Sequence, residues 1–122
     1  MATILVVEDT SAIRFLVTYV LKTRGHEVVT AENGLAVAET MRITRPALVL
    51  LDMSMPYKDG WTTVQELRAD PELRDIPVVA LTAHALPGDR ERALSLGCVD
   101  YMSKPFEADQ LLDLVDRHLA GQ

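Results

Sequence analysis

The stretch "LVLLDMSMPYKDG", residues 48–60, contains four consecutive aliphatic residues that run directly into a carboxylate, Asp52. A short apolar run rich in branched side chains is typical of a strand that is buried on both faces, as in parallel sheets. Asp52 then stands where burial ends and solvent begins. One interpretation is that Asp52 only ends the strand, since Asp is common in turns. The other is that it joins polar groups from the ends of other strands.

The rest of the chain repeats this strand pattern at regular intervals. Short apolar runs predict strands at 3–7, 27–31, 47–51, 78–82 and 99–103. The segments between them, and the one after the last, have the apolar spacing of helices that pack on a sheet by one face. Strands that alternate with helices form parallel sheets through right-handed crossovers. The sequence therefore predicts an α/β fold, a (βα)5 doubly wound five-stranded parallel sheet in the order 2-1-3-4-5.

In two of the predicted helices, the spacing of the apolar residues predicts which side chains face the core. In the first helix, one apolar stripe is formed by Ile13, Leu16, Val17, Val20 and Leu21. The second helix opens at Asn33-Gly34, and its Leu35, Ala38 and Met41 are expected to point inward. The spacing of both sets predicts that they pack against the sheet.

Polar side chains stand at the carboxyl ends of the strands, the edge where doubly wound sheets bind their ligands. Glu8 and Asp9 follow the first strand, and Asp52 follows the third. Because these two strands are neighbours in the predicted order, the three carboxylates are expected to lie together. Their repulsion is on the order of several kcal/mol per close pair at an effective dielectric constant of about 20. A divalent cation would relieve it, and an all-oxygen ligand set suits Mg²⁺.

The fourth and fifth strands bring two further groups to the same edge. Thr82 ends the fourth strand, and Lys104 follows the fifth directly after Ser103. A hydroxyl and an ammonium group opposite a metal ion would together suit a phosphoryl group. The sequence thus predicts a site for a divalent cation and a phosphoryl group.

Length and charge exclude several classes of protein. A chain of 122 residues fits one domain, 1–122, and its net charge of −6 disfavours a nucleic-acid surface. No apolar stretch approaches the length that spans a membrane. The single cysteine, Cys98, cannot form an internal disulfide, so the simplest assumption is that the protein is found in a reducing compartment. We therefore expect a cytoplasmic protein without direct contact to nucleic acid or membrane.

Four motifs at the strand ends together resemble the receiver domain of two-component response regulators. They are "LVVED" at 5–9, "LLDMSMP…DG" from 50 to 60, "ALTA" at 80–83 and "YMSKPF" at 101–106. Each is short, but all four occur in order at the expected strand ends, and the resemblance covers the whole chain. It implies the flavodoxin/receiver-like fold and a bacterial signalling role.

The resemblance also implies a role for each residue of the site. Asp52 would be the phosphoacceptor, and Glu8 and Asp9 the acidic pair that holds Mg²⁺, Glu8 either directly or through water. The main-chain carbonyl of Ser54 would be a further metal ligand. Lys104 would pair with the phosphoryl oxygens, next to a cis peptide bond to Pro105. Thr82 and Tyr101 match the family's switch pair, so that phosphorylation would reshape the surface formed by helix four, strand five and helix five.

Two positions depart from the usual pattern of the family, and one segment is a candidate for a moving part. Glu8 stands where Asp is more frequent in the family, and Lys58 stands where an apolar residue is usual. The segment 83–88 is a candidate for the element that moves in the switch. Within it, His84 is interpreted either as a group that tunes water access or as an exposed loop residue without a catalytic part.

The implied partners are a histidine kinase or phosphotransfer protein and a downstream protein. Too little chain follows Lys104 for an output domain, so we expect a stand-alone receiver, a monomer or weak dimer, that catalyses its own phosphorylation and dephosphorylation. It would act by protein contact or relay the phosphoryl group.

Other classes of protein fit the sequence less well. A haloacid-dehalogenase-type phosphatase would carry its acids as D-x-D, whereas Glu8 and Asp9 are adjacent. A flavodoxin-like cofactor binder would need a phosphate cradle that "EDTSA" at 8–12 lacks. The alternative kept open is a receiver-like binding module that is not phosphorylated.

Overall fold

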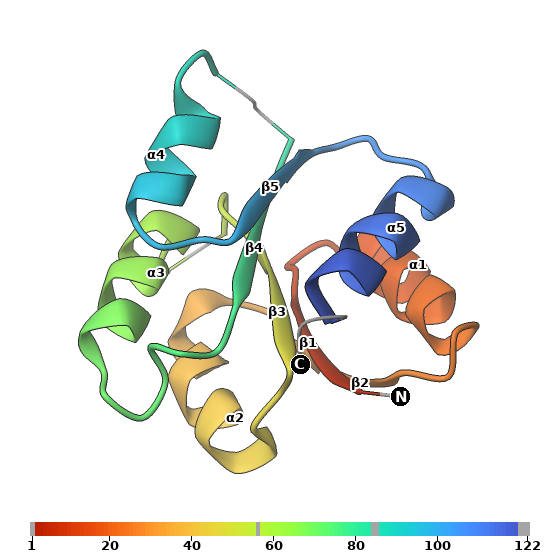
Figure 1. The fold of residues 1–122 in the computed structure, drawn as a ribbon, viewed down its shortest axis with the longest axis horizontal. Helices are drawn as coiled ribbons and strands as arrows, with labels where there is room; N and C mark the ends of the chain where they lie inside the picture. Colours follow the sequence, from red (N-terminus) through yellow and green to blue (C-terminus); the bar gives the residue numbers. More distant parts are fainter. Residues whose placement is uncertain (1, 56, 84–85, 120–122) are drawn as a thin grey trace.

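The computed structural model describes residues 2–55, 57–83 and 86–119 and contains one five-stranded parallel sheet. Its strands are β1 (Thr3–Val7), β2 (Glu27–Ala31), β3 (Leu48–Asp52), β4 (Val78–Thr82) and β5 (Asp100–Ser103). Their order is β2-β1-β3-β4-β5, and every pairing is parallel (Figure 1). The predicted fold and strand order are confirmed.

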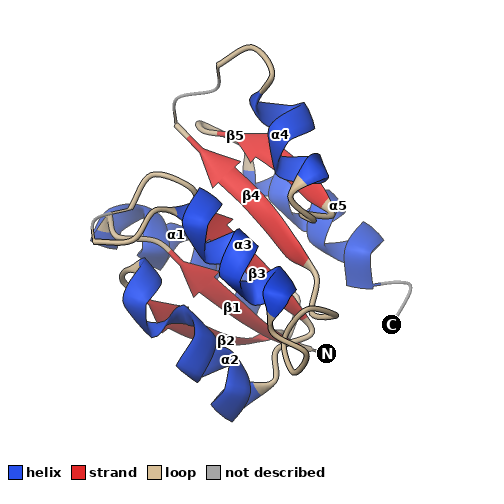
Figure 2. Cartoon of the chain, turned by 90° about the vertical axis from the view of Figure 1, so that its left-hand side faces the viewer, coloured by secondary structure: helices blue, strands red, loops and turns tan. Residues whose placement is uncertain are grey.

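The helices cover both faces of the sheet. They are α1 (Ser11–Lys22), α2 (Val37–Thr44), α3 (Gly60–Ala69), α4 (Asp89–Ser95) and α5 (Ala108–Leu119), with a 3₁₀ turn η1 (Gly34–Ala36) before α2. α1 and α5 lie on one face, and α2, α3 and α4 lie on the other (Figures 1 and 2). This three-layer arrangement leaves the carboxyl edge of the strands as the place where loops from several units meet.

The alternation of side chains along each strand divides the core into two parts. In β1, Leu5 and Val7 pack with α2 and α3, whereas Ile4 and Val6 pack with α1 and α5. β3 lies between β1 and β4, and its side chains from Leu48 to Asp52 are all buried. A central strand covered on both faces explains the continuous apolar run that precedes Asp52.

The boundaries of two strands differ from the prediction by one residue. β3 begins at Leu48 and includes Asp52, and β5 begins at Asp100. Asp52 belongs to the strand because it pairs in register with Leu81 of β4, so the ladder continues through it. The backbone of Asp52 is thus held by the sheet ladder itself.

Two of the expected burials are wrong. Leu16 is 55% exposed, because α1 turns its face with Val17, Val20 and Leu21 to the core and leaves Leu16 at the margin. Leu35 is 62% exposed. It lies in the 3₁₀ turn η1, which has three residues per turn, so it is out of phase with the buried face of α2. Oδ1 of Asn33 accepts a hydrogen bond from the Leu35 N–H at the start of this turn. Ala38 of α2 is partly buried against the core, and Met41 is fully buried as expected.

The described helices are not of the kind that crosses a membrane. None of them combines the length and the apolar character that a span requires.

Candidate functional site

Three carboxylates meet at the carboxyl ends of β1 and β3. These strands are neighbours, with Val7 of β1 paired to Leu51 of β3, so the next residues of both strands reach the same edge. One carboxylate oxygen from each of Glu8, Asp9 and Asp52 lies within 4.8 Å of the other two. The strand order predicted this juxtaposition, and the structure confirms it.

The three carboxylates differ in their surroundings. Glu8 and Asp52 are buried, with 1% and 3% of their surface exposed, while Asp9 is exposed. Oε2 of Glu8 accepts a hydrogen bond of 3.1 Å from the backbone N–H of Thr10. The β1–α1 loop is held further by Arg14, whose guanidinium donates to the backbone carbonyl oxygen of Glu8 at 2.8 Å. The cluster is therefore open to solvent on the Asp9 side.

Lys104 approaches the cluster from the end of β5. Its Nζ forms an ion pair with Oε1 of Glu8 and lies 3.4 Å from Oδ2 of Asp52. Its backbone N–H donates to the carbonyl oxygen of Thr82 at 2.7 Å, and the bond from Lys104 to Pro105 is cis. The ammonium group thus sits between two buried carboxylates, and its predicted role toward phosphoryl oxygens stays a prediction.

The position of Asp52 in the site raises the pKa of its carboxyl group. Burial raises the pKa of its carboxyl to about 6, and the neighbouring Glu8 acts in the same direction. The backbone N–H of Ser54, which donates to Oδ1 at 2.9 Å, and the Lys104 ammonium act to lower the pKa. Because burial dominates, an ionised Asp52 is costly in the metal-free protein.

A substitution at this position is expected to stabilise the metal-free fold. Since the folded-state pKa lies above the ordinary value of 3.8, the contribution of Asp52 to stability is complete below that pH and is lost as the pH rises through about 6. Asp52→Asn stays neutral, so at pH 8 in EDTA we expect a free energy of unfolding higher by on the order of 2 kcal/mol. Urea titrations at pH 8 and pH 4 measure it, and the difference should fall below about 1 kcal/mol at pH 4. Equal stability at pH 8 would contradict this account.

The predicted switch residues, Thr82 and Tyr101, lie on β4 and β5, the two strands that follow β3 in the sheet. Thr82 is buried at the end of β4, the strand that pairs with β3. The ring of Tyr101 is half-buried and packs against the core on the side of α3 and α4, and its hydroxyl is buried without a hydrogen-bond partner among the described residues. The ring of Tyr101 thus lies against the core in this structure, and its role as a switch stays a prediction. The predicted function of His84 falls outside the described residues.

The ligand chemistry of the cluster fits a magnesium ion. Three carboxylates with one ammonium group leave net negative charge in a partly buried site. Carboxylate oxygens on one side and access for water on the other match what Mg²⁺ prefers.

Arg14 is a residue of the site that the sequence analysis did not identify. It holds the loop that carries Glu8 and Asp9, and nothing in the sequence distinguishes it from other basic residues on the surface of α1.

Comparison with known proteins gives consistent matches along nearly the whole chain. Residues 4–116 match the model of the response regulator receiver domain. The polar-differentiation response regulator DivK of Brucella anthropi is 34% identical over 116 residues, which cover 95% of this chain and 94% of DivK. The chemotaxis protein CheY4 of Vibrio cholerae has a TM-score of 0.90 at 28% identity, covering 98% of this chain and 99% of CheY4.

One similar structure is described with a metal ion. The receiver domain of a sensor histidine kinase from Pseudomonas aeruginosa, at 33% identity and a TM-score of 0.88, has magnesium coordinated in its active site cleft. The match covers 98% of both chains.

Proposed function

Because the chain belongs to the response regulator receiver domain family, we propose that Asp52 accepts a phosphoryl group from a histidine kinase or phosphotransfer protein. The observation that carries this proposal is the cluster of Glu8, Asp9 and Asp52, with Lys104 beside it, at one edge of the sheet. The family membership establishes a role in two-component signalling, and the geometry supports Asp52 as the acceptor.

The proposed metal site follows from the same cluster. Asp9, Asp52 and the main-chain carbonyl of Ser54 would hold Mg²⁺, with Glu8 as the further acidic residue of the site. When bound, the ion would neutralise charge on the phosphoryl oxygens. The magnesium ion described for the Pseudomonas aeruginosa receiver domain supports this assignment.

The proposed reaction is an in-line transfer to the side chain of Asp52. A carboxylate oxygen forms the new P–O bond while the P–N bond of a phosphohistidine breaks, and the electron pair leaves with the imidazole nitrogen. Lys104 would stabilise the equatorial oxygens, since its Nζ already lies 3.4 Å from Oδ2 of Asp52. The product is an acyl phosphate, which water can later hydrolyse in the same site.

The proposed output is a change in a protein-binding face formed by α4, β5 and α5. The hydroxyl of Thr82 would bind a phosphoryl oxygen, and Tyr101 would occupy the space beside it. The altered face would bind a downstream protein, or the phosphoryl group would pass on in a relay. We propose a monomer or weak dimer, and a cytoplasmic location, which the free, buried thiol of Cys98 suits.

The test of this function uses a small phosphodonor and needs no cognate kinase. After incubation with acetyl phosphate and Mg²⁺, we expect the intact mass of the protein to increase by one phosphoryl group. EDTA should prevent the increase, and hydroxylamine should reverse it, because it cleaves acyl phosphates. If the mass does not change, and phosphohistidine donors also fail, the chain is a receiver-like binding module that is not phosphorylated.

A further inference from the structure

The loop between β3 and α3 carries Ser54, and two contacts outside the acidic cluster hold this loop in place. The backbone N–H of Ser54 donates to Oδ1 of Asp52 at 2.9 Å, so the position of the loop bears directly on the phosphoacceptor. Where the loop ends, the N–H of Gly60 donates to the carbonyl oxygen of Met53 at 3.1 Å. This bond closes the base of the loop, and two contacts hold Lys58, which belongs to the described residues 57–59 of its far part.

The first contact comes from the connection between β2 and α2. Gly34 is buried, and a Cβ placed on it would lie 2.3 Å from the carbonyl oxygen of Lys58. The same Cβ would lie 3.0 Å from Cβ of Lys58 and from Oγ1 of Thr63. The backbone of Gly34 is not left-handed, so glycine is required there for space and not for conformation. The turn after β2 thus presses against the backbone of the β3–α3 loop.

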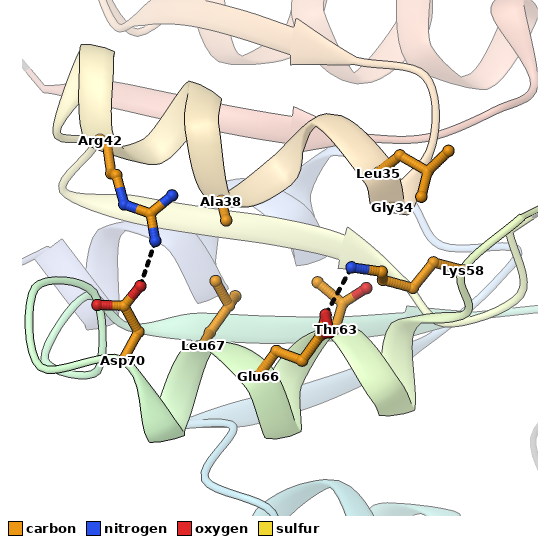
Figure 3. A pocket seen from close by; sticks show the side chains of 9 residues that line it. All are labelled: Gly34, Leu35, Ala38, Arg42, Lys58, Thr63, Glu66, Leu67 and Asp70. Atoms are coloured by element: carbon orange, nitrogen blue, oxygen red, sulfur yellow. Dashed lines mark hydrogen bonds and ion pairs between the residues drawn. The ribbon is translucent and has the colours of Figure 1, made fainter.

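The second contact is an ion pair between the loop and α3. Nζ of Lys58 lies 2.6 Å from Oε1 of Glu66 (Figure 3). Both side chains line a groove of about 260 Å³ between α2 and α3, which Gly34, Ala38 and Leu67 also line. The side chain of Lys58 is therefore tied to α3, and its carbonyl oxygen lies directly against Gly34. Lys58 is also the position where the sequence departs from the apolar residue usual in the family.

We propose that Gly34 and the Lys58–Glu66 pair are positioning residues for the metal site. They hold the β3–α3 loop so that Ser54 stays aligned with Asp52, and this alignment sets the affinity for Mg²⁺. None of the three residues belongs to the acidic cluster of Glu8, Asp9 and Asp52. The inference rests on the proposed function only in taking the site to bind Mg²⁺.

The direction in which substitutions at Lys58 and Glu66 change the Mg²⁺ affinity distinguishes a positioning role from a simple effect of charge. Lys58→Met removes a positive charge from the loop that follows Asp52, which by charge alone would strengthen Mg²⁺ binding. Glu66→Gln removes a negative charge, which by charge alone would weaken it. If the pair positions the loop, both variants weaken binding, by roughly two- to five-fold for a partly exposed ion pair. The double variant should weaken binding no more than either single variant.

A larger effect is expected at Gly34. In Gly34→Ala the new Cβ must displace the carbonyl of Lys58, and we expect Mg²⁺ affinity to fall by about 10-fold or more, as for outer-shell groups of metal sites. Gly25→Ala is the matched control. Gly25 has a φ of +80°, and a Cβ added there would have nothing within 4 Å, so alanine lowers stability without touching the loop.

The experiment is a calorimetric titration of the unphosphorylated chain and these variants with MgCl₂, together with urea unfolding in EDTA. We expect weaker binding in Gly34→Ala, Lys58→Met and Glu66→Gln, unchanged binding in Gly25→Ala, and recovery in Lys58→Arg. The positioning role would be overturned if the Lys58 and Glu66 variants changed the Mg²⁺ affinity in opposite directions, or if all affinities lay within two-fold of that of the unaltered chain. Either result would leave the proposed function intact. If the unaltered chain itself binds no Mg²⁺, the proposed function fails together with the positioning role.

Discussion

Replacing Lys104 by methionine is expected to slow phosphorylation of Asp52 by acetyl phosphate about 100-fold at saturating Mg²⁺, the usual cost of losing one group that stabilises charge in a transition state. The ammonium group lies 3.4 Å from Oδ2 of Asp52. In the proposed reaction, charge would develop on the phosphoryl oxygens at this place. It is delivered there by β5 and by the bond from its N–H to the carbonyl oxygen of Thr82. The measurement is the rate of appearance of phosphorylated protein by intact mass.

A loss of stability must be separated from this loss of rate. Lys104 also pairs with Glu8, which is only 1% exposed, so methionine leaves a buried carboxylate without its cation. Removing one partner of a buried pair costs roughly 3–5 kcal/mol. The rates should therefore be compared only where urea titrations show both proteins folded. Lys104→Arg keeps the charge but not the compact ammonium, and an intermediate rate is expected. A methionine variant within three-fold of the unaltered rate would contradict the proposed role.

Much of the fold follows from patterns that are local in the sequence. The run from Leu48 to Leu51 predicts a buried parallel strand because every side chain in it is apolar, and all of them are buried in β3. The alternation of strands and helices then fixes the topology, since parallel strands need crossovers. From this topology the meeting of Glu8, Asp9 and Asp52 could be predicted without coordinates.

Other features depend on contacts between distant parts of the chain. The spacing of Leu16 fits the apolar stripe of α1, yet its exposure is decided by how the helix sits on the sheet and against α5. The pairing of Lys104 with Glu8 depends on side chains 96 positions apart, so the sequence predicts only that both reach the same edge. Likewise, nothing local to Asn33-Gly34 indicates that the glycine presses on Lys58. A single domain at 1–122 without an output domain stays a prediction.

The largest expected effect is the complete loss of phosphorylation in Asp52→Asn. An amide nitrogen replaces the carboxylate oxygen next to Lys104, so the side chain has no anionic oxygen to attack phosphorus. The rest of the site should remain intact, because the Asn side-chain oxygen can still accept the hydrogen bond from the N–H of Ser54. Glu8 and Asp9 would remain as carboxylates in the variant and serve as an internal control for acceptor identity.

The intact mass of the unaltered chain and of Asp52→Asn, incubated side by side with acetyl phosphate and Mg²⁺, shows directly whether Asp52 is the phosphoryl acceptor. We expect a gain of one phosphoryl group in the unaltered chain and none in the folded variant. A gain of equal size in Asp52→Asn would contradict this expectation, because Asp52 would then not be the acceptor.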